Sequence, residues 1–350
     1  IAAEGPSAFY EGEAATALVT AVRDAGGVLT EADLASYEPR PTEPLTGSFD
    51  GLTLHVMPPP SSGGVALLET LNVLTAREER AGRLSLDSPA GRHRLTEALK
   101  HSFADRAAFL GDPYHAARTG DPLPIRRLIS REYAEALAAK IDPARTFPPA
   151  HYGRIAPVRD GGTSHLSVVD AAGNAVACTE TINTVFGSLV VTETGVILNN
   201  EMDDFAARPG KPNAYGLLQS EANAVGPGRV PLSSMSPTIG VRGGRATLAV
   251  CASGGPRIIT ATLQTLLNRV RGGMSPSAAV AAPRLHHQWI PDRLEAEPAI
   301  YDETRRALGP LGHEVRERAD LGVAQIAVRN ADGTLSAAAD PRKGGAAAGF

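Results

Sequence analysis

Residues 161–170 read GGTSHLSVVD, in which two glycines and a threonine stand directly before an alternating strand pattern. Because glycine allows backbone geometries that other residues resist, the Oγ of Thr163 could reach the carbonyl of Gly162. Cleavage of that bond would give Thr163 a free α-amine, which is a general base next to the nucleophile. An ordinary loop before a strand would contain the same three residues, so the surrounding sequence has to separate the two interpretations.

The strand pattern around the turn at 171–174 predicts a hairpin in which paired residue numbers sum to about 345. This register places Thr163 opposite Thr181 to Asn183, so a second hydroxyl is expected beside the first. By strand alternation His165 shares a face with Thr163, and it could serve as a base. The α-amine of Thr163 would lie closer to the hydroxyl, so we interpret His165 as structural.

The pattern of the whole chain changes near residue 163. Before it we expect helices at 13–25, at 30–34 and from Ser88 to Gly111, a breaker-rich loop at 58–64 and a polar surface segment at 142–160. After it we expect hairpin strands at 166–170 and 175–181, and again at 238–242 and 245–251.

Two glycines follow the last of these strands. Gly254 and Gly255 precede a helix whose apolar positions keep helical spacing from Ile259 to Val270. Their N–H groups, free of side chains at a helix N-terminus, suit an oxyanion. An ordinary tight turn between a strand and a helix explains the same residues.

Composition sets broad limits. The chain has 350 residues, is 43% hydrophobic and 5% aromatic, and carries a formal net charge of -4, with acids and bases interspersed. Nothing here indicates a nucleic-acid or membrane-surface partner, and no apolar run is long enough to span a membrane. Cys178 and Cys251 lie in apolar strand patterns and are expected to be buried free thiols. The chain opens at Ile1 without a methionine, so we expect further sequence upstream.

Several blocks, in order along the whole chain, resemble the γ-glutamyltranspeptidase family. The small-subunit blocks are TSHLSVVD (163–170), NNEMDDF (199–205), PLSSMSPT (231–238), GGPRIIT (254–260) and PRLHHQW (283–289). The segments 57–64, 104–106 and 110–113 resemble the second half of the family's large subunit. The resemblance implies an N-terminal-nucleophile hydrolase with an α+β fold, a four-layer αββα sandwich.

The same resemblance implies a precursor that cleaves itself between Gly162 and Thr163. Residues 163–350 would form a complete small subunit, and residues 1–162 the later part of a large subunit. No cofactor or metal is implied, and bacterial members of the family are usually periplasmic or secreted.

The family's residue roles carry over to matching positions. Thr163 would be the nucleophile, with Thr181 hydrogen-bonded to it and Gly254 and Gly255 forming the oxyanion hole. The substrate would be bound by Asn183, Glu201 and Asp204 at its α-amino group, by Ser233 and Ser234 at its α-carboxylate, and by a lid residue, Tyr215. Two carboxylates suit an ammonium, because charge-assisted hydrogen bonds are short and strong.

These residues also have simpler explanations. Glu201 and Asp204 alone would more often belong to a solvated loop or a helix N-terminus, and Ser233 with Ser234 to a turn. His286 and His287 could suggest a metal, but adjacent strand residues point in different directions, so we expect none there.

The sequence departs from the family at two points. Ser164 replaces a second threonine, and the upstream arginine that clamps the substrate's α-carboxylate has no counterpart in this chain.

Three functions remain open from the sequence. The first is γ-glutamyl transfer from glutathione or a related compound to water, an amino acid or a dipeptide. The second is a related amidase, such as a glutaryl-type cephalosporin acylase or a poly-γ-glutamate hydrolase. The third is a truncated, unprocessed and inactive precursor. Glu201 and Asp204 favour the first, because they predict a free α-amino group in the substrate.

Overall fold

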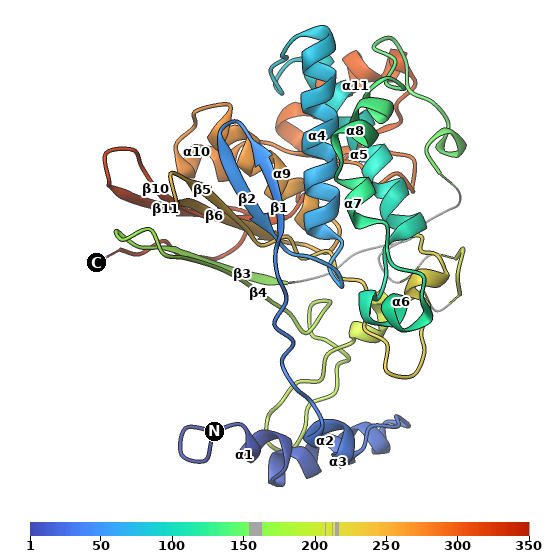
Figure 1. The fold of residues 1–350 in the computed structure, drawn as a ribbon, viewed down its shortest axis with the longest axis vertical. Coiled ribbons are helices and arrows are strands. Elements are labelled where there is room, and N and C mark those ends of the chain that lie inside the picture. Colours follow the sequence, from blue (N-terminus) through green and yellow to red (C-terminus); the bar gives the residue numbers. More distant parts are fainter. Residues whose placement is uncertain (154–162, 207, 212, 214–216, 350) are drawn as a thin grey trace. The chain divides into compact units, whose positions relative to one another are not determined.

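A computed structural model describes residues 1–153, 163–206, 208–211, 213 and 217–349. The chain forms two compact units (Figure 1). The first contains Ile1–Glu43 and Thr181–Glu201, and the second contains Pro44–Glu180 and Met202–Phe350. The predicted division at Gly162 and Thr163 concerns a covalent bond, so the boundary between compact units does not test it.

The first unit holds three short helices, α1 (Ser7–Tyr10), α2 (Glu13–Asp24) and α3 (Glu31–Ala35). The last two confirm the helices expected near residues 13–25 and 30–34. Thr30 begins α3 with a capping box, in which the Asp33 N–H donates to Thr30 Oγ1 at 3.2 Å and the Thr30 N–H donates to Asp33 Oδ2 at 2.8 Å.

The second unit is organised by a six-stranded antiparallel sheet. Its order is β1 (Leu45–Phe49), β2 (Leu52–Val56), β5 (Thr238–Arg242), β6 (Arg245–Ser253), β10 (Val323–Arg329) and β11 (Leu335–Ala339). The predicted hairpin at 238–251 is therefore confirmed as β5 and β6. Because β2 pairs with β5, segments from both sides of Thr163 share one sheet.

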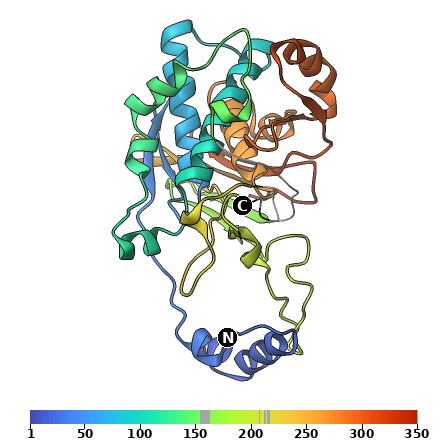
Figure 2. The same cartoon turned by 90° about the vertical axis from the view of Figure 1, so that its right-hand side faces the viewer.

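Two long helices, α4 (Gly63–Ala81) and α9 (Arg257–Val270), pack against this sheet. Two others, α5 (Pro89–Phe109) and α8 (Arg131–Ala138), pack against α4. Figures 1 and 2 show α4 and α5 running side by side. As predicted, Ser88 caps α5, its Oγ accepting from the Gly91 N–H at 3.1 Å, and the stripe of Leu95, Leu99 and Phe103 is buried. The core lies between these helices and the sheet.

The expected loop at 58–64 is wrong in its last two residues, because Gly63 and Gly64 begin α4. A Cβ on Gly63 would meet the Met235 carbonyl oxygen at 2.3 Å, and one on Gly64 would meet that of Met57 at 2.2 Å. The two glycines therefore permit a close approach between the helix start and the neighbouring backbone. At this position the two glycines do not interrupt the secondary structure, because both belong to the first turn of α4.

The hairpin of β3 (Ser164–Val169) and β4 (Ala175–Glu180) packs against β6 and β10. Its paired residue numbers sum to 344, one less than predicted, since Ser164 pairs with Glu180. One face of β4 turns outward, so Cys178 is exposed and the expectation of a buried thiol is wrong there. Cys251, on the central strand β6, is buried as expected. Both thiols are free.

Shorter elements complete the second unit. They are α6 (Pro113–Thr119), α7 (Ile125–Leu128), α10 (Pro276–Ala281), α11 (Pro298–Leu308), β7 (Leu285–His286), β8 (Leu294–Ala296), β9 (Val315–Glu317), and the 3-10 turns Pro149–His151, Glu201–Asp204, Glu221–Asn223 and Gly309–Leu311. The fold mixes helices and sheets, as predicted. Among the described residues, no helix has the length and apolar character needed to cross a membrane.

Candidate active site

Thr163 lies immediately before β3 and is half-buried. Its carbonyl oxygen accepts a hydrogen bond from Lys343 Nζ at 3.5 Å. The register of β3 with β4 ends at the pair Ser164 and Glu180, and Thr163 and Thr181 are the next residues on the two strands. Gly162, the other side of the predicted cleavage bond, lies outside the described residues.

His165 is held by two hydroxyl groups. Its Nδ1 lies 2.8 Å from Thr179 Oγ1, and its Nε2 lies 2.9 Å from Ser167 Oγ. Burial lowers the pKa of His165 to about 4, although a backbone hydrogen bond with Cys178 opposes the change. The ring is therefore neutral at pH 7 and both its nitrogens are engaged, which favours the structural interpretation of this histidine over a role as base.

Gly254 and Gly255 form the turn between β6 and α9, which confirms the predicted junction of strand and helix. Their φ angles are +127° and +55°, a region that side chains disfavour. A Cβ on Gly254 would also meet the Cα of Gly322 at 3.1 Å. Among the described residues, neither N–H donates to a backbone carbonyl outside the regular elements. An oxyanion hole requires N–H groups without a backbone acceptor, so both glycines remain candidates for that role.

A cavity of about 830 Å³ lies along β3, β10, β11 and residues 343–349, and it reaches Ser253 at the end of β6. Its lining includes Ser164, next to Thr163, and Ser253, next to Gly254. Lys343, the donor to the Thr163 carbonyl, lines it too. The chain neighbours of the predicted nucleophile and of the predicted oxyanion turn therefore line one cavity of the second unit.

Ser233 and Ser234 lie in a segment bound to the loop before α4. The Ser62 N–H and Oγ both donate to the Ser233 carbonyl oxygen, at 2.9 and 2.7 Å, and the Ser233 N–H donates to the Pro60 carbonyl at 2.9 Å. Ser61 and Ser233 form a parallel β-bridge. The backbone of this segment is therefore fixed by hydrogen bonds that a free surface turn would lack.

Asp204 is 8% exposed, so the interpretation as a solvated loop residue fails for it. Its carbonyl oxygen accepts from the side-chain amides of Asn223, at 2.8 Å, and Asn213, at 3.4 Å. These bonds hold the 3-10 turn in which the carboxylate sits.

Three other predicted residues belong to the first unit. The Asn183 N–H donates to Thr181 Oγ1 at 2.7 Å, and Asn183 adopts a positive φ of 61° in this turn. The Glu201 N–H donates to Asn199 Oδ1 at 3.0 Å. Their roles toward Thr163 remain predictions. Tyr215, the predicted lid residue, lies outside the described residues.

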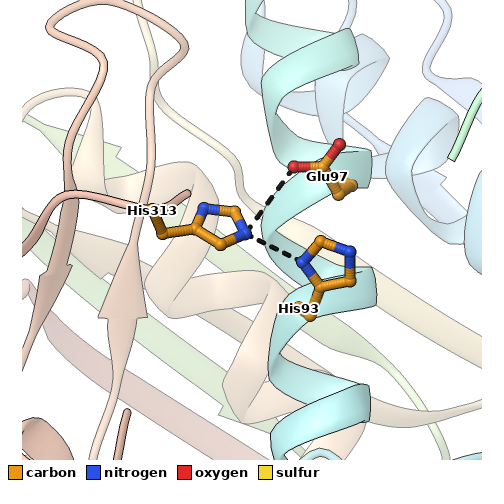
Figure 3. Close-up of side chains that lie close together, drawn as sticks. All are labelled: His93, Glu97 and His313. Atoms are coloured by element: carbon orange, nitrogen blue, oxygen red, sulfur yellow. Dashed lines mark hydrogen bonds and ion pairs between the residues drawn. The ribbon is translucent and has the colours of Figure 1, made fainter. Parts of the chain in front are cut away.

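One cluster has the composition of a metal site: His93, Glu97 and His313 place possible ligand atoms within 4.8 Å of one another (Figure 3). His93 Nε2 must donate to the Asp142 carbonyl at 2.8 Å, so His93 Nδ1 accepts from His313 Nε2 at 2.8 Å. Two nitrogens on one tetrahedral metal would lie about 3.3 Å apart. A proton on His313 Nε2 therefore explains the geometry better than a metal ion.

The carboxylate of Glu97 in the same cluster accepts hydrogen bonds from two hydroxyl groups. Glu97 accepts from Thr146 Oγ1 at 2.7 Å and from the Tyr152 hydroxyl. Burial lowers the pKa of His313 to about 2, with the nearby imidazoles and Lys100 adding to the effect. These hydrogen bonds tie α5 to distant segments of the chain.

His286 and His287 meet different partners, as their strand position predicted. His286 contacts Thr260 Oγ1 at 2.8 Å, whereas His287 lies 3.4 Å from Asp292.

Two buried arginines near the site have no role predicted from the sequence. Arg257, the first residue of α9, pairs with Glu295 on β8 at 2.7 Å, and both side chains are buried. Arg106, near the end of α5, donates to Ser62 and Ser234. Arg106 and Arg257 both lie in segments that resemble the family, 104–106 and 254–260. Neither segment contains a pattern that indicates the partner of its arginine, because each partner is distant in sequence.

A family model described as gamma-glutamyltranspeptidase matches residues 1–350. The glutathione hydrolase proenzyme of Escherichia coli K12 is 40% identical over 345 residues, which cover 98% of this chain and 58% of that protein. The chain thus spans little more than half the length of this relative.

Two solved structures extend the comparison. Cephalosporin acylase from Bacillus halodurans superimposes with a TM-score of 0.78 at 25% identity, over 96% of this chain and 58% of that one. A chain of a mutant γ-glutamyltranspeptidase from Helicobacter pylori is 40% identical with a TM-score of 0.50, and it covers 51% of this chain and 100% of its own length. With a family model that matches from the first residue to the last, this chain belongs to the γ-glutamyltranspeptidase family.

Proposed function

We propose that the protein cleaves the γ-glutamyl amide bond of glutathione or a related compound, and passes the γ-glutamyl group to water or to an amino acid or peptide. The cavity lined by both Ser164 and Ser253 supports this proposal, because these residues are the chain neighbours of Thr163 and Gly254. A nucleophile and an oxyanion hole must reach the same carbonyl group.

The reaction proceeds in two halves. Thr163 Oγ attacks the γ-carbonyl carbon while the α-amine of Thr163 accepts the hydroxyl proton. The N–H groups of Gly254 and Gly255 stabilise the oxyanion. The intermediate collapses, the C–N bond breaks, and the amine product leaves with the proton from the α-ammonium group. Water or an acceptor amine then attacks the γ-glutamyl ester and releases Thr163.

Substrate recognition follows from charge. Asp204, with Asn183 and Glu201, binds the α-ammonium group, and Ser233 and Ser234 bind the α-carboxylate. The burial of Asp204 supports the first role, because a charge-assisted hydrogen bond gains strength away from water. Thr181 hydrogen-bonds to Thr163 in this proposal. The two residues would be the next pair if the register of β3 with β4 continued beyond Ser164 and Glu180.

The mature form requires cleavage between Gly162 and Thr163, which yields the two subunits of residues 1–162 and 163–350. The finer fold proposal is the four-layer αββα sandwich. The exposed outer face of the β3–β4 hairpin, with Leu166, Val168 and Val176, supports a further layer over it. A periplasmic or secreted location follows only from the family.

The experiment that tests this function is Thr163→Ala in the purified protein. We expect loss of both self-cleavage and γ-glutamyl turnover, because the substitution removes the hydroxyl oxygen that forms the ester in this mechanism. Ser164→Ala, which removes the adjacent exposed hydroxyl, is the matched control and should retain both. Turnover retained in Thr163→Ala would refute the mechanism.

A related amidase is the second candidate, favoured by the similarity to the cephalosporin acylase structure. Glutaryl and γ-glutamyl anilides separate the two, because a glutaryl group lacks the α-ammonium group that Asp204 would bind. We expect at least a tenfold preference for γ-glutamyl anilide, in line with the loss of a charged hydrogen bond. A glutaryl preference would assign the acylase function, and no turnover of either would indicate an inactive precursor.

A further inference from the structure

Arg106 is among the most deeply buried charged residues, with 1% of its surface exposed. It stands near the C-terminal end of α5, where its guanidinium reaches two serines from distant parts of the chain. Nε donates to Ser62 Oγ at 2.8 Å, and Nη2 donates to Ser234 Oγ at 3.4 Å. One rigid, planar cation thus spans the start of α4 and the proposed carboxylate-binding segment.

The charge of Arg106 is not neutralised in the usual way. The buried arginines Arg92, Arg257 and Arg284 each form an ion pair with a carboxylate at 2.7 or 2.8 Å. Arg106 forms no such pair within 4 Å among the described residues, and its Nη1 is buried without a hydrogen-bond partner. A buried cation in this state is costly, and an anion nearby would relieve the cost.

Arg106 keeps its charge at neutral pH. Burial lowers the pKa of its guanidinium to about 10, and the carboxylate of Asp204 opposes this change. The guanidinium therefore lies near both predicted binding groups, Asp204 for the substrate ammonium and Ser234 for the substrate carboxylate. Its field would weaken an ammonium site by itself, so its position is best explained by the carboxylate.

The direction of the hydrogen bonds is informative. Ser62 Oγ accepts from Arg106 and donates its own hydrogen to the Ser233 carbonyl oxygen at 2.7 Å. Ser234 Oγ also accepts from Arg106, which has only donors. The Ser234 hydroxyl hydrogen must therefore point away from the guanidinium, where it can be donated to an anion.

We propose that Arg106 is a positioning residue for carboxylate selectivity: it orients the Ser234 hydroxyl as a donor to the substrate's α-carboxylate and places a positive charge behind that hydroxyl. This inference rests on the proposed function, in which Ser233 and Ser234 bind that carboxylate. In this inference, the positive charge of Arg106 acts on the substrate's α-carboxylate through the Ser234 hydroxyl.

Two anilide substrates test the proposal. L-γ-glutamyl-p-nitroanilide carries the α-carboxylate, and 4-aminobutyryl-p-nitroanilide is the same molecule without it. The ratio of their kcat/KM values measures carboxylate selectivity. In Arg106→Gln we expect this ratio to fall about 10- to 100-fold, mainly through a higher KM for the γ-glutamyl substrate, because a charge-assisted contact is lost. Arg106→Lys keeps the charge without the planar fork and should give an intermediate ratio.

Arg92→Gln is the matched control, because Arg92 is also a buried arginine on α5 but pairs with Glu303 and Thr304. We expect it to lower the thermal midpoint and to leave the ratio unchanged. Ser234→Ala combined with Arg106→Gln should change the ratio no more than either substitution alone, since the two residues act as one unit.

The possible outcomes distinguish failure of the proposed function from failure of the role inferred for Arg106. If the wild-type protein does not turn over the γ-glutamyl substrate, the proposed function fails. If it does, but Arg106→Gln reduces kcat/KM equally for both substrates, Arg106 is only structural and the inference is overturned. Should Arg106→Gln fail to fold or to be processed, Arg106→Lys decides the matter, and an unchanged ratio there overturns the inference.

Discussion

The buried ion pair behind the glycine turn gives a quantitative prediction. Arg257 begins α9, separated from Gly254 and Gly255 by Pro256, and its Nη2 and Nε lie 2.7 and 3.2 Å from Glu295 Oε2. The two side chains are 6% and 7% exposed. We therefore expect Glu295→Gln to destabilise the protein strongly, because it removes a negative charge that pairs with this buried arginine.

The magnitude follows from the pKa of Glu295. Burial raises this pKa, but the nearby cationic groups His286 and Arg257 more than offset it and bring it to about 2. His286 is itself neutral above a pH of about 3, so Arg257 supplies the charge at neutral pH. A pKa lowered from 4.5 to about 2 corresponds to about 3.4 kcal/mol, which includes the effect of charged His286 and is therefore an upper bound for the pair with Arg257 at pH 7. Breaking a buried pair by removing one partner costs about 3–5 kcal/mol, so we expect a loss near the lower end of that range.

The assay is urea unfolding followed by the fluorescence of Trp289, the single tryptophan of the chain. A Thr163→Ala background keeps the protein as one chain. Because the folded pKa of Glu295 lies below its unfolded value, its contribution is complete above about pH 4.5 and is lost as the pH falls toward 2. The difference between the two proteins should therefore be about 3 kcal/mol at pH 7 and shrink below pH 4.5.

Glu314→Gln is the control, since Glu314 pairs with Arg316 on the surface, where both side chains are more than half exposed. It should cost less than about 1 kcal/mol. A loss of the same small size in Glu295→Gln at pH 7 would refute the reasoning that the buried pair supports the start of α9.

Three further predictions concern single residues. Gly254→Ala should lower kcat by about 10²- to 10³-fold, because a side chain at its φ would displace an oxyanion donor; Gly244→Ala, also at positive φ but in the open hairpin turn, is the kinetic control and should leave kcat unchanged. His165→Gln should leave the acid limb of the kcat/KM profile in place, because the pKa of His165 is already about 4. The contribution of neutral His165 to the free energy of unfolding, which is complete above pH 6.5 and lost toward pH 4, should be absent from the unfolding curves of this variant. Ellman's reagent should titrate Cys178 alone in the folded protein, and both thiols only after unfolding, because burial also raises the pKa of Cys251; rapid reaction of both would contradict the fold.

Local signals predicted part of this structure well. The hairpin β5–β6, the cap of α5 at Ser88 and the glycine turn at Gly254 each depend on residues close in sequence. The register of β3 with β4 was predicted within one unit, because a short turn determines it. Such features can be derived because their interactions are contained within a few residues.

Contacts between distant segments could not be predicted in this way. Arg106 and Ser234 are 128 residues apart, and no pattern in either segment indicates the other. The same limit explains why Gly63 and Gly64 were assigned to a loop, since what they approach is the backbone of Met235 and Met57. Cys178 was expected to be buried because an apolar strand pattern alone does not show which face meets the second sheet.

In the proposed mechanism, Thr163 becomes an N-terminal nucleophile. Intact-mass spectrometry and N-terminal sequencing of the purified protein, after prolonged incubation at neutral pH, detect the cleavage that this requires. We predict two fragments, of which the second begins at Thr163, and a single uncleaved mass for Thr163→Ala. One uncleaved mass for the wild-type protein, or cleavage at another bond, would contradict the account.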